Sequence, residues 1–162
     1  MTGKCQNLKF GFTAAATSAD TECSSDGERY AQMLTDCKLG FELGYDCAWV
    51  LEHHFTDYFP TPSPIVVMSH LAAAFPGLSL GSCVLVLPWY NPLRLAEEIS
   101  MLSHFCKGDL HLAFGRGTAK IEYDAYDIDM SSAKERFKEA IKIINQALLG
   151  EPFEFKGDFY EV

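Results

Sequence analysis

The stretch of residues 47–55 constrains the fold of this chain most strongly. It begins as a continuous apolar run, which is typical of a strand buried on both faces, and it continues into Glu52, His53 and His54. In parallel α/β proteins, functional sites are built at the carboxyl ends of the strands. The stretch therefore predicts a parallel α/β fold with ionisable groups where this strand leaves the core.

Four apolar strand patterns alternate with helical patterns along the chain. The expected strands cover residues 8–13, 47–55, 78–87 and 110–114, and the expected helices cover residues 30–41, 63–75, 92–106 and 132–148. Successive strands begin roughly thirty to forty residues apart, which is the span of one parallel βα unit. Four units fit either an open sheet or half of an eight-fold barrel, because a complete barrel needs about 250 residues. We expect one domain over residues 1–162, with the βα units over residues 8–150.

The segments after the fourth strand have weaker patterns. Residues 118–130 are rich in Asp and Tyr, and we expect them to form a solvated loop. Ser132 and Glu135 have the spacing of a capping box, which predicts the start of the last helix. The tail, residues 151–162, predicts a short hairpin that turns at residues 156–157.

The net charge and the cysteines limit which binding partners and which cellular compartment we expect. Lys and Arg number 13 against 22 Asp and Glu, so the net charge of −9 argues against a nucleic acid or an anionic membrane as partner. The six cysteines form no C-x-x-C pair, so we expect no metal site. Several of them lie inside apolar runs, so we expect reduced thiols and therefore a cytoplasmic protein. No apolar run reaches transmembrane length, and the first twenty residues lack a signal-peptide core.

Two strand ends carry residues that could take part in catalysis or ligand binding. Strand alternation sends the side chains of His53 and His54 to opposite sides, so only one imidazole can face a cleft, where it would suit proton transfer. The alternative is that one histidine is a hydrogen-bonded structural residue and the other is partly exposed. Gly115, Arg116 and Gly117 would let a flat or anionic ligand approach the backbone, with the guanidinium pairing to phosphate. The alternative for these three is a tight turn with a solvated Arg116.

Five motifs together resemble the bacterial luciferase-like flavin-dependent monooxygenase family. They occupy residues 52–55, 81–88, 91–98, 107–110 and 114–117, in the order and spacing of that family. The resemblance implies the amino-terminal half of a TIM-type (βα) barrel. It also implies an enzyme that uses reduced FMN and O₂ to oxidise a small organic substrate, such as an aldehyde or a ketone. A separate NAD(P)H-dependent flavin reductase would supply the reduced flavin.

The resemblance assigns roles to residues that follow or belong to the second and third expected strands. His53 matches the catalytic histidine beside the flavin, and Glu52 is its expected catalytic neighbour. The peptide bond between Cys83 and Val84 matches a cis bond under the flavin ring, so these two residues are expected cofactor contacts.

The resemblance also assigns roles to the end of the fourth expected strand and to two of the helices. Arg116 matches a contact to the flavin phosphate, and Gly115 is expected beside it in the cofactor site. Gly115 stands where the light-emitting luciferase subunit has a reactive cysteine, which favours a general oxygenase over light emission. The helices at residues 63–75 and 92–106 correspond to the dimer face of the family, which implies a homodimer.

Three alternatives to this reading stay open. One is a reductase of the same superfamily that uses a deazaflavin hydride donor. Another is a truncated, non-catalytic flavin-binding protein, because the chain is shorter than the family's barrel. A metal-dependent hydrolase that uses Glu52, His53 and His54 has less support, because no further ligand cluster is visible in the sequence.

Overall fold

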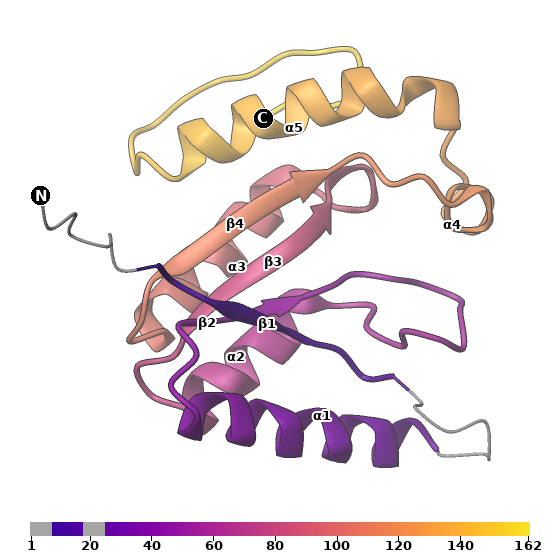
Figure 1. The fold of residues 1–162 in the computed structure, drawn as a ribbon. Coiled ribbons are helices and arrows are strands. Elements are labelled where there is room, and N and C mark those ends of the chain that lie inside the picture. The colour runs from indigo at the N-terminus through magenta and orange to yellow at the C-terminus, as the bar shows by residue number, and fades with distance from the viewer. Residues whose placement is uncertain (1–7, 18–24) are drawn as a thin grey trace, which may run out of the picture.

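A parallel four-stranded sheet forms the centre of the protein. The computed structural model describes residues 8–17 and 25–162, and its sheet has the strand order β1-β2-β3-β4 (Figure 1). The strands are β1 (Gly11–Ala14), β2 (Cys47–Val50), β3 (Ser79–Val86) and β4 (Leu110–Gly115). The main helices are α1 (Asp26–Glu42), α2 (Pro64–Ala74), α3 (Pro92–Phe105) and α5 (Ala133–Ala147). All three strand pairs are parallel, which confirms the α/β fold with four βα units.

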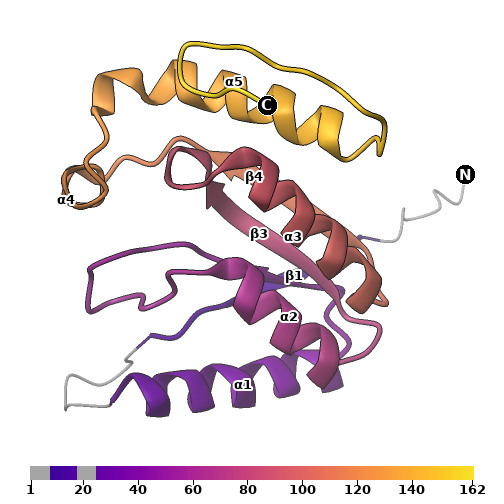
Figure 2. The same cartoon turned by 180° about the vertical axis from the view of Figure 1, so that it is seen from behind.

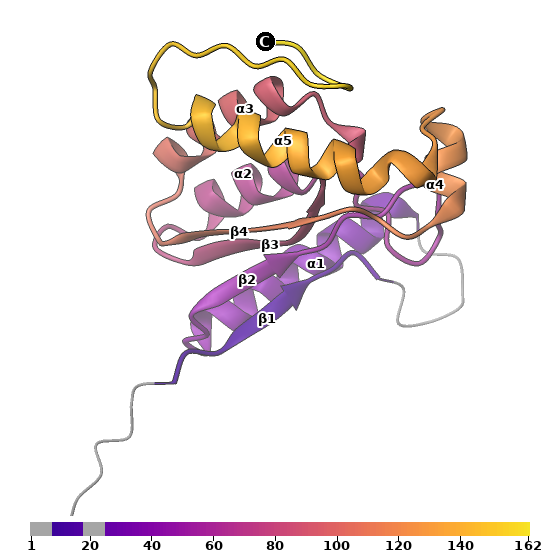
Figure 3. The same ribbon diagram turned by 90° about the horizontal axis from the view of Figure 1, so that it is seen from above.

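The helices α2 and α3 cover one face of the sheet. The strands lie in front of these two helices in Figure 1 and behind them in the reverse view of Figure 2. Seen from above, the strand direction changes from β1 and β2 to β3 and β4, as expected for a twisted parallel sheet (Figure 3). Ala48, Val50 and Leu80 are fully buried in the core that the strands share with the helices.

The other residues of the strands point to the opposite face, as strand alternation requires. Thr13, Trp49, Gly81 and His111 form one row across the four strands. The Trp49 and His111 rings stack over Gly81, with centroids 5.8 Å apart. A Cβ atom at Gly81 would lie 2.4 Å from Cε3 of Trp49, so this close approach explains a glycine inside a strand.

Local signals begin and end the helices. Ser25 and Glu28 form a reciprocal capping box at the start of α1, and Gly44 follows the helix with a φ of +81°. The side chain of Asn91 accepts hydrogen bonds from two backbone N–H groups at 3.0 and 3.1 Å, and Pro92 opens α3. Asn91 is therefore the N-cap of α3, and Gly44 lies just beyond the end of α1.

The segment at residues 118–130, expected to be a solvated loop, contains a helix. It is α4 (Lys120–Ala125), and a 3₁₀ turn, η2 (Met130–Ser132), follows it. Glu122 and Tyr123 are 3% and 1% exposed. Because their burial comes from contacts with distant parts of the chain, the polar composition of the segment gave no sign of it.

The expected capping box at the start of α5 is wrong. Ser132 already has a helical backbone, with φ −80° and ψ −10°, and an N-cap residue needs a non-helical one. Its hydroxyl donates to the carbonyl of Asp129 at 2.6 Å, and Glu135 pairs with Lys138 at 2.8 Å instead. The helical turn starts earlier, at η2, where the Asp129 side chain accepts from a backbone N–H at 2.9 Å.

The tail forms the expected hairpin, although without regular strands. Phe155 and Val162 exchange two backbone hydrogen bonds of 2.9 Å, and the N–H of Gly157 donates to the carbonyl of Tyr160 at 2.9 Å. The turn therefore lies between Gly157 and Tyr160, beyond the position expected for it. Glu139 on α5 accepts hydrogen bonds from three backbone N–H groups of this turn at 2.8, 3.1 and 3.2 Å, which explains the shift.

Four cysteines are free thiols, namely Cys37, Cys47, Cys83 and Cys106, whereas Cys5 and Cys23 lie outside the described residues. Within residues 8–17 and 25–162, no helix has both the length and the apolar composition needed to cross a membrane. The same residues hold no group of three His, Cys, Asp or Glu side chains that could bind a metal ion.

Candidate functional site

A cavity of about 340 Å³ lies where β2, β3 and β4 end. We call it the strand-end cavity. Its lining includes seven residues that the sequence singled out, namely Glu52, His53, Cys83, Val84, Gly115, Arg116 and Gly117. These side chains come from three neighbouring strands, because parallel strands bring their carboxyl ends to one edge of the sheet. The volume lies in the range of small-molecule sites, which is about 300–1,000 Å³.

His53 reaches the cavity from the segment after β2. Its backbone N–H donates to the carbonyl of Thr61 at 3.1 Å. Its ring stacks on Phe59, with centroids 5.5 Å apart and the planes inclined by 19°. The Nδ1 atom lies 3.7 Å from Oε1 of Glu122, and about a third of the side chain is exposed. The imidazole is therefore held in one place while part of it stays accessible to a ligand.

His54 points away from the cavity into a buried hydrogen-bond network. Its Nε2 atom lies 2.9 Å from Oε1 of Glu52, and its Nδ1 atom lies 2.8 Å from the hydroxyl of Tyr126. Oε2 of Glu52 accepts hydrogen bonds from the backbone N–H of Val86 and the hydroxyl of Tyr90, both at 3.0 Å. One histidine is thus a buried structural residue and the other is partly exposed. The separation expected from strand alternation is present, although the strand predicted over residues 47–55 ends at Val50 and both histidines follow it.

Glu52 lines the strand-end cavity together with His53, and its carboxyl group belongs to the buried network around His54. Its side chain is 0% exposed, and its described hydrogen bonds go to His54, Val86 and Tyr90 rather than to the His53 ring. Burial, together with the nearby Glu52 carboxylate, raises the pKa of the Tyr90 hydroxyl. Tyr90 therefore stays protonated near neutral pH and remains a hydrogen-bond donor to Glu52.

Cys83 and Val84 of β3 and Gly115 of β4 line one side of the cavity, which we call its floor. The peptide bond between Cys83 and Val84 is cis, as the resemblance implies. The register of β3 and β4 shifts between Ser82 and Leu85, beside this bond. A Cβ atom at Gly115 would lie 2.4 Å from Cγ2 of Val84, so only a glycine fits here without displacing the floor.

Arg116 follows Gly115 at the end of β4, in the turn that the sequence suggested. Its carbonyl accepts a short hydrogen bond from the hydroxyl of Tyr123, and Gly117 continues the turn with a φ of +74°. A Cβ atom at Gly117 would lie 2.8 Å from Cγ1 of Val86 and 3.0 Å from Cζ2 of Trp89. The turn therefore packs tightly against the end of β3, and the exposed Arg116 lines the cavity.

Sequence reasoning missed the contribution of α4 to the site. Glu122 lines the cavity beside His53, although its segment was expected to be solvated. Tyr123 and Tyr126 pack against Trp89, with ring centroids 4.5 and 5.2 Å away. The three-residue spacing of the two tyrosines is a helical signal, and it could have indicated that one face of this segment is buried.

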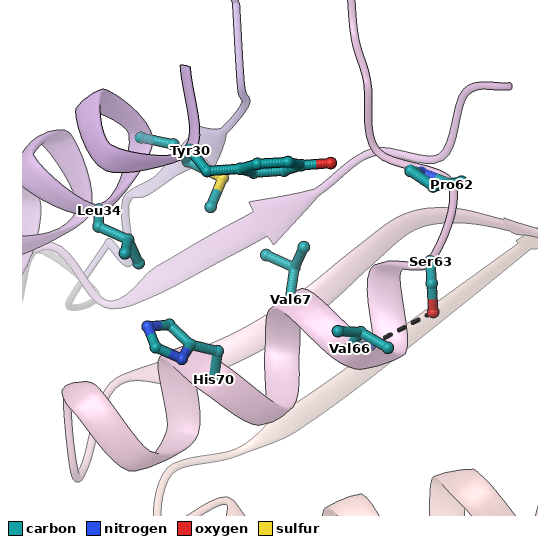
Figure 4. Close-up of a pocket in the computed structure, with 8 residues that line it drawn as sticks. Tyr30, Leu34, Pro62, Ser63, Val66, Val67 and His70 are labelled. Atoms are coloured by element: carbon teal, nitrogen blue, oxygen red, sulfur yellow. Dashed lines mark hydrogen bonds between the residues drawn. The ribbon is translucent and has the colours of Figure 1, made fainter. Parts of the chain in front are cut away.

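A second groove, of about 580 Å³, lies between α1 and α2 and is apart from the strand ends (Figure 4). Figure 4 shows Tyr30 and Leu34 on one wall and Val66, Val67 and His70 on the other. This lining is mainly apolar and shares no residue with the strand-end cavity. The groove therefore lacks the carboxylate and guanidinium that make the strand-end cavity the better candidate site.

Comparison with known proteins agrees with the resemblance in sequence. Residues 9–162 match the family model of luciferase-like monooxygenases. An uncharacterized protein of Sinorhizobium fredii, y4wF, is 34% identical over 143 residues, which are 88% of this chain and 42% of that protein. The oxygenase component of the flavin-dependent trigonelline monooxygenase of Acinetobacter baylyi is 28% identical over 134 residues, which are 82% and 37% of the two chains.

A solved structure shows the same fold. The oxygenating constituent of 3,6-diketocamphane monooxygenase from Pseudomonas putida, a type II Baeyer-Villiger monooxygenase in complex with FMN, superposes with a TM-score of 0.87 at 18% identity. The match covers 96% of this chain and 43% of that one. The chain spans less than half the length of each of these three proteins. Because the family model matches nearly all of its residues, the chain belongs to the luciferase-like monooxygenase family.

Proposed function

We propose that this protein is the oxygenase of a flavin-dependent monooxygenase, which uses reduced FMN and O₂ on a small organic substrate such as an aldehyde or a ketone. One observation carries the proposal: His53 and Arg116, from the ends of β2 and β4, line the same cavity. Membership of the luciferase-like family supports it, and so does the flavin dependence named for the Acinetobacter relative. Reduced flavin, when bound, supplies the electrons that activate O₂.

The residues of the strand-end cavity fit such a cofactor. The Arg116 guanidinium suits the FMN phosphate, because its donors match phosphate oxygens in pairs. The glycine at position 115 leaves the Val84 side chain in place, so Cys83 and Val84 could line the face of a flat ring. His53 would hold or release a proton at the reacting atoms, as a positioned imidazole does in general acid–base catalysis.

An adjoining hollow offers room for the organic substrate. It measures about 370 Å³, and Thr13, Trp49, Leu51 and Cys83 line it. Cys83 also lines the strand-end cavity, so the two spaces meet at this residue. The lining is mainly apolar with one hydroxyl, which suits a small apolar molecule that carries a carbonyl group.

Titration of FMN against the 162-residue chain tests the cofactor site. Flavin fluorescence should report saturable binding of oxidised FMN, and anaerobic titration should do so for reduced FMN. Removing a hydrogen bond to a charged group costs about 1.5–3 kcal/mol, so we expect Arg116→Ala to weaken binding roughly 10- to 100-fold. Arg94→Ala is the matched control, because its side chain is 71% exposed on α3 and does not line the cavity.

The outcomes separate the proposal from its alternatives. Equal affinities in wild type and Arg116→Ala, or no FMN binding at all, would refute the proposed site. Binding of a deazaflavin in place of FMN would instead identify the reductase. With a flavin reductase, NAD(P)H and ¹⁸O₂ added, the oxygenase should incorporate labelled oxygen into an aldehyde or ketone, and His53→Ala should lower the rate about 10²- to 10⁴-fold. FMN binding without labelled product would identify the non-catalytic flavin binder.

We also propose a cytoplasmic homodimer that receives reduced flavin from a separate NAD(P)H-dependent reductase. Apolar side chains on the two helices of the expected dimer face support this arrangement. Val66 on α2 and Met101 and Phe105 on α3 are more than half exposed. Light scattering should find a dimer for wild type and a monomer for the double variant Val66→Asp/Met101→Asp, whereas a monomeric wild type would exclude this interface.

A further inference from the structure

The helix α4 brings a buried carboxyl group, that of Glu122, to the edge of the strand-end cavity. Its side chain is 4% exposed. Burying a carboxyl group is costly unless it has polar partners, so the partners indicate its role. Oε1 accepts a hydrogen bond from the backbone N–H of His54 at 3.1 Å and lies 3.7 Å from Nδ1 of His53. One oxygen atom therefore faces both the backbone and the functional ring that follow β2.

Packing orients the His53 ring toward this carboxyl group. One ring face stacks on Phe59, and Tyr58 lies at a tilt of 56° with its centroid 5.5 Å away. The hydrogen bond from the His53 backbone to Thr61 holds the chain beneath the ring. Because both the ring face and the backbone are held, the approach of Nδ1 to Glu122 is a consequence of the fold.

Contacts of two tyrosine side chains hold α4 in place. The hydroxyl of Tyr123 donates to the carbonyl of Arg116, and the hydroxyl of Tyr126 lies 2.8 Å from Nδ1 of His54. Both tyrosine rings pack on Trp89. This short helix therefore contacts the chain after β2 and the chain after β4. It places Glu122 relative to both strand ends that carry the proposed function.

We propose that Glu122 is a positioning residue, which keeps the neutral His53 ring protonated on Nδ1 and leaves Nε2 as its basic atom. A carboxylate beside one nitrogen of an imidazole favours the tautomer whose N–H faces it. The inference deepens the proposed function and rests on it, because a basic Nε2 is the atom that would accept a proton in the cavity.

Nitrogen NMR of the histidine rings tests the proposal directly. Long-range ¹H–¹⁵N spectra of ¹⁵N-histidine protein, at a pH where the ring is neutral, distinguish Nδ1–H from Nε2–H, and His53→Gln assigns the signals. We expect the Nδ1–H form in wild type. In Glu122→Gln, which keeps an acceptor oxygen for the His54 N–H, the ratio of Nδ1–H to Nε2–H should fall several-fold. Asp124→Asn is the matched control, because it lies on the same helix with 63% of its side chain exposed.

Each outcome decides between positioning and a merely structural role. The same His53 tautomer in wild type and Glu122→Gln would overturn the proposal, and so would an Nε2–H ring in wild type. If Glu122→Gln fails to fold, the wild-type spectrum still decides, because an Nε2–H ring contradicts the proposal. FMN titration of the same samples keeps the two questions apart: wild type that holds the Nδ1–H form without binding FMN refutes the proposed function and leaves the orientation of His53 by Glu122 standing.

Discussion

Replacing Glu52 by Ala should lower the stability of the fold rather than remove a catalytic group from an intact site. The side chain is fully buried, and three partners share its two oxygens. In Glu52→Ala, the backbone N–H of Val86, the hydroxyl of Tyr90 and Nε2 of His54 lose their partner together. A buried polar group left unsatisfied costs about 1–3 kcal/mol. Allowing for partial relaxation, we expect the free energy of unfolding to fall by roughly 4 kcal/mol.

This loss is large relative to the stability of a typical domain, which is about 5–15 kcal/mol. The urea dependence of unfolding in small proteins is about 1–3 kcal/mol per molar, so the unfolding midpoint should fall by roughly 2 M. Circular dichroism during urea titration measures this shift. Glu52→Gln keeps one acceptor oxygen and should lose about half as much. Glu97→Ala is the control, because its side chain is 69% exposed and surface changes stay within about 0.5 kcal/mol.

The result for Glu52→Ala separates two readings of the same residue. If its urea midpoint equals that of Glu97→Ala, the buried network does not support the fold and the argument from hydrogen bonds is wrong. If stability is unchanged while FMN-dependent oxygenation is lost, Glu52 acts in catalysis, as the resemblance first implied.

Three further predictions concern the strands and the buried thiols. Gly81→Ala would place Cβ 2.4 Å from Trp49, so unfolding by heat should show a loss of about 1–3 kcal/mol, and an unchanged melting temperature would contradict the proposed close approach. Cys83 is exposed, whereas burial raises the pKa of Cys37 and of Cys47 to about 11, so mass spectrometry should find Cys83 alkylated well before these two. In the folded state the pKa of both thiols lies above the ordinary value of 9.0, so the same thiols lose their protons at lower pH in the unfolded state. The urea midpoint should therefore be unaffected by these thiols below pH 9 and fall between pH 9 and 11, and a constant midpoint there would contradict their burial.

The order of strands and helices could be predicted because its signals are local. A cap such as Asn91 acts on the backbone two or three residues away, and Gly44 ends α1 through its own φ angle. The apolar run of β2 likewise follows from neighbouring residues. A local signal also failed where a neighbouring local signal competes with it. Ser132 and Glu135 have the spacing of a capping box, but a turn around Asp129 had already begun the helix.

The candidate site could be predicted in part from the direction of the strands. Parallel strands place their carboxyl ends together, so the residues after β2 and β4 were expected to meet, and His53 and Arg116 line one cavity. The partners of Glu52 could not be predicted, since Val86 and Tyr90 lie 34 and 38 positions along the chain from it. A spacing of that size carries no periodic signal.

The sequence by itself determined the four parallel βα units, the strand ends that carry an imidazole and a guanidinium, and the opposite directions of His53 and His54. Each of these follows from periodicity, from chain direction or from alternation along one strand. Only the tertiary structure decided that Glu122, on a segment that looked solvated, faces His53. The physical reason is that its burial depends on the ring of Trp89, against which α4 packs, and no local pattern records a contact between segments more than thirty residues apart.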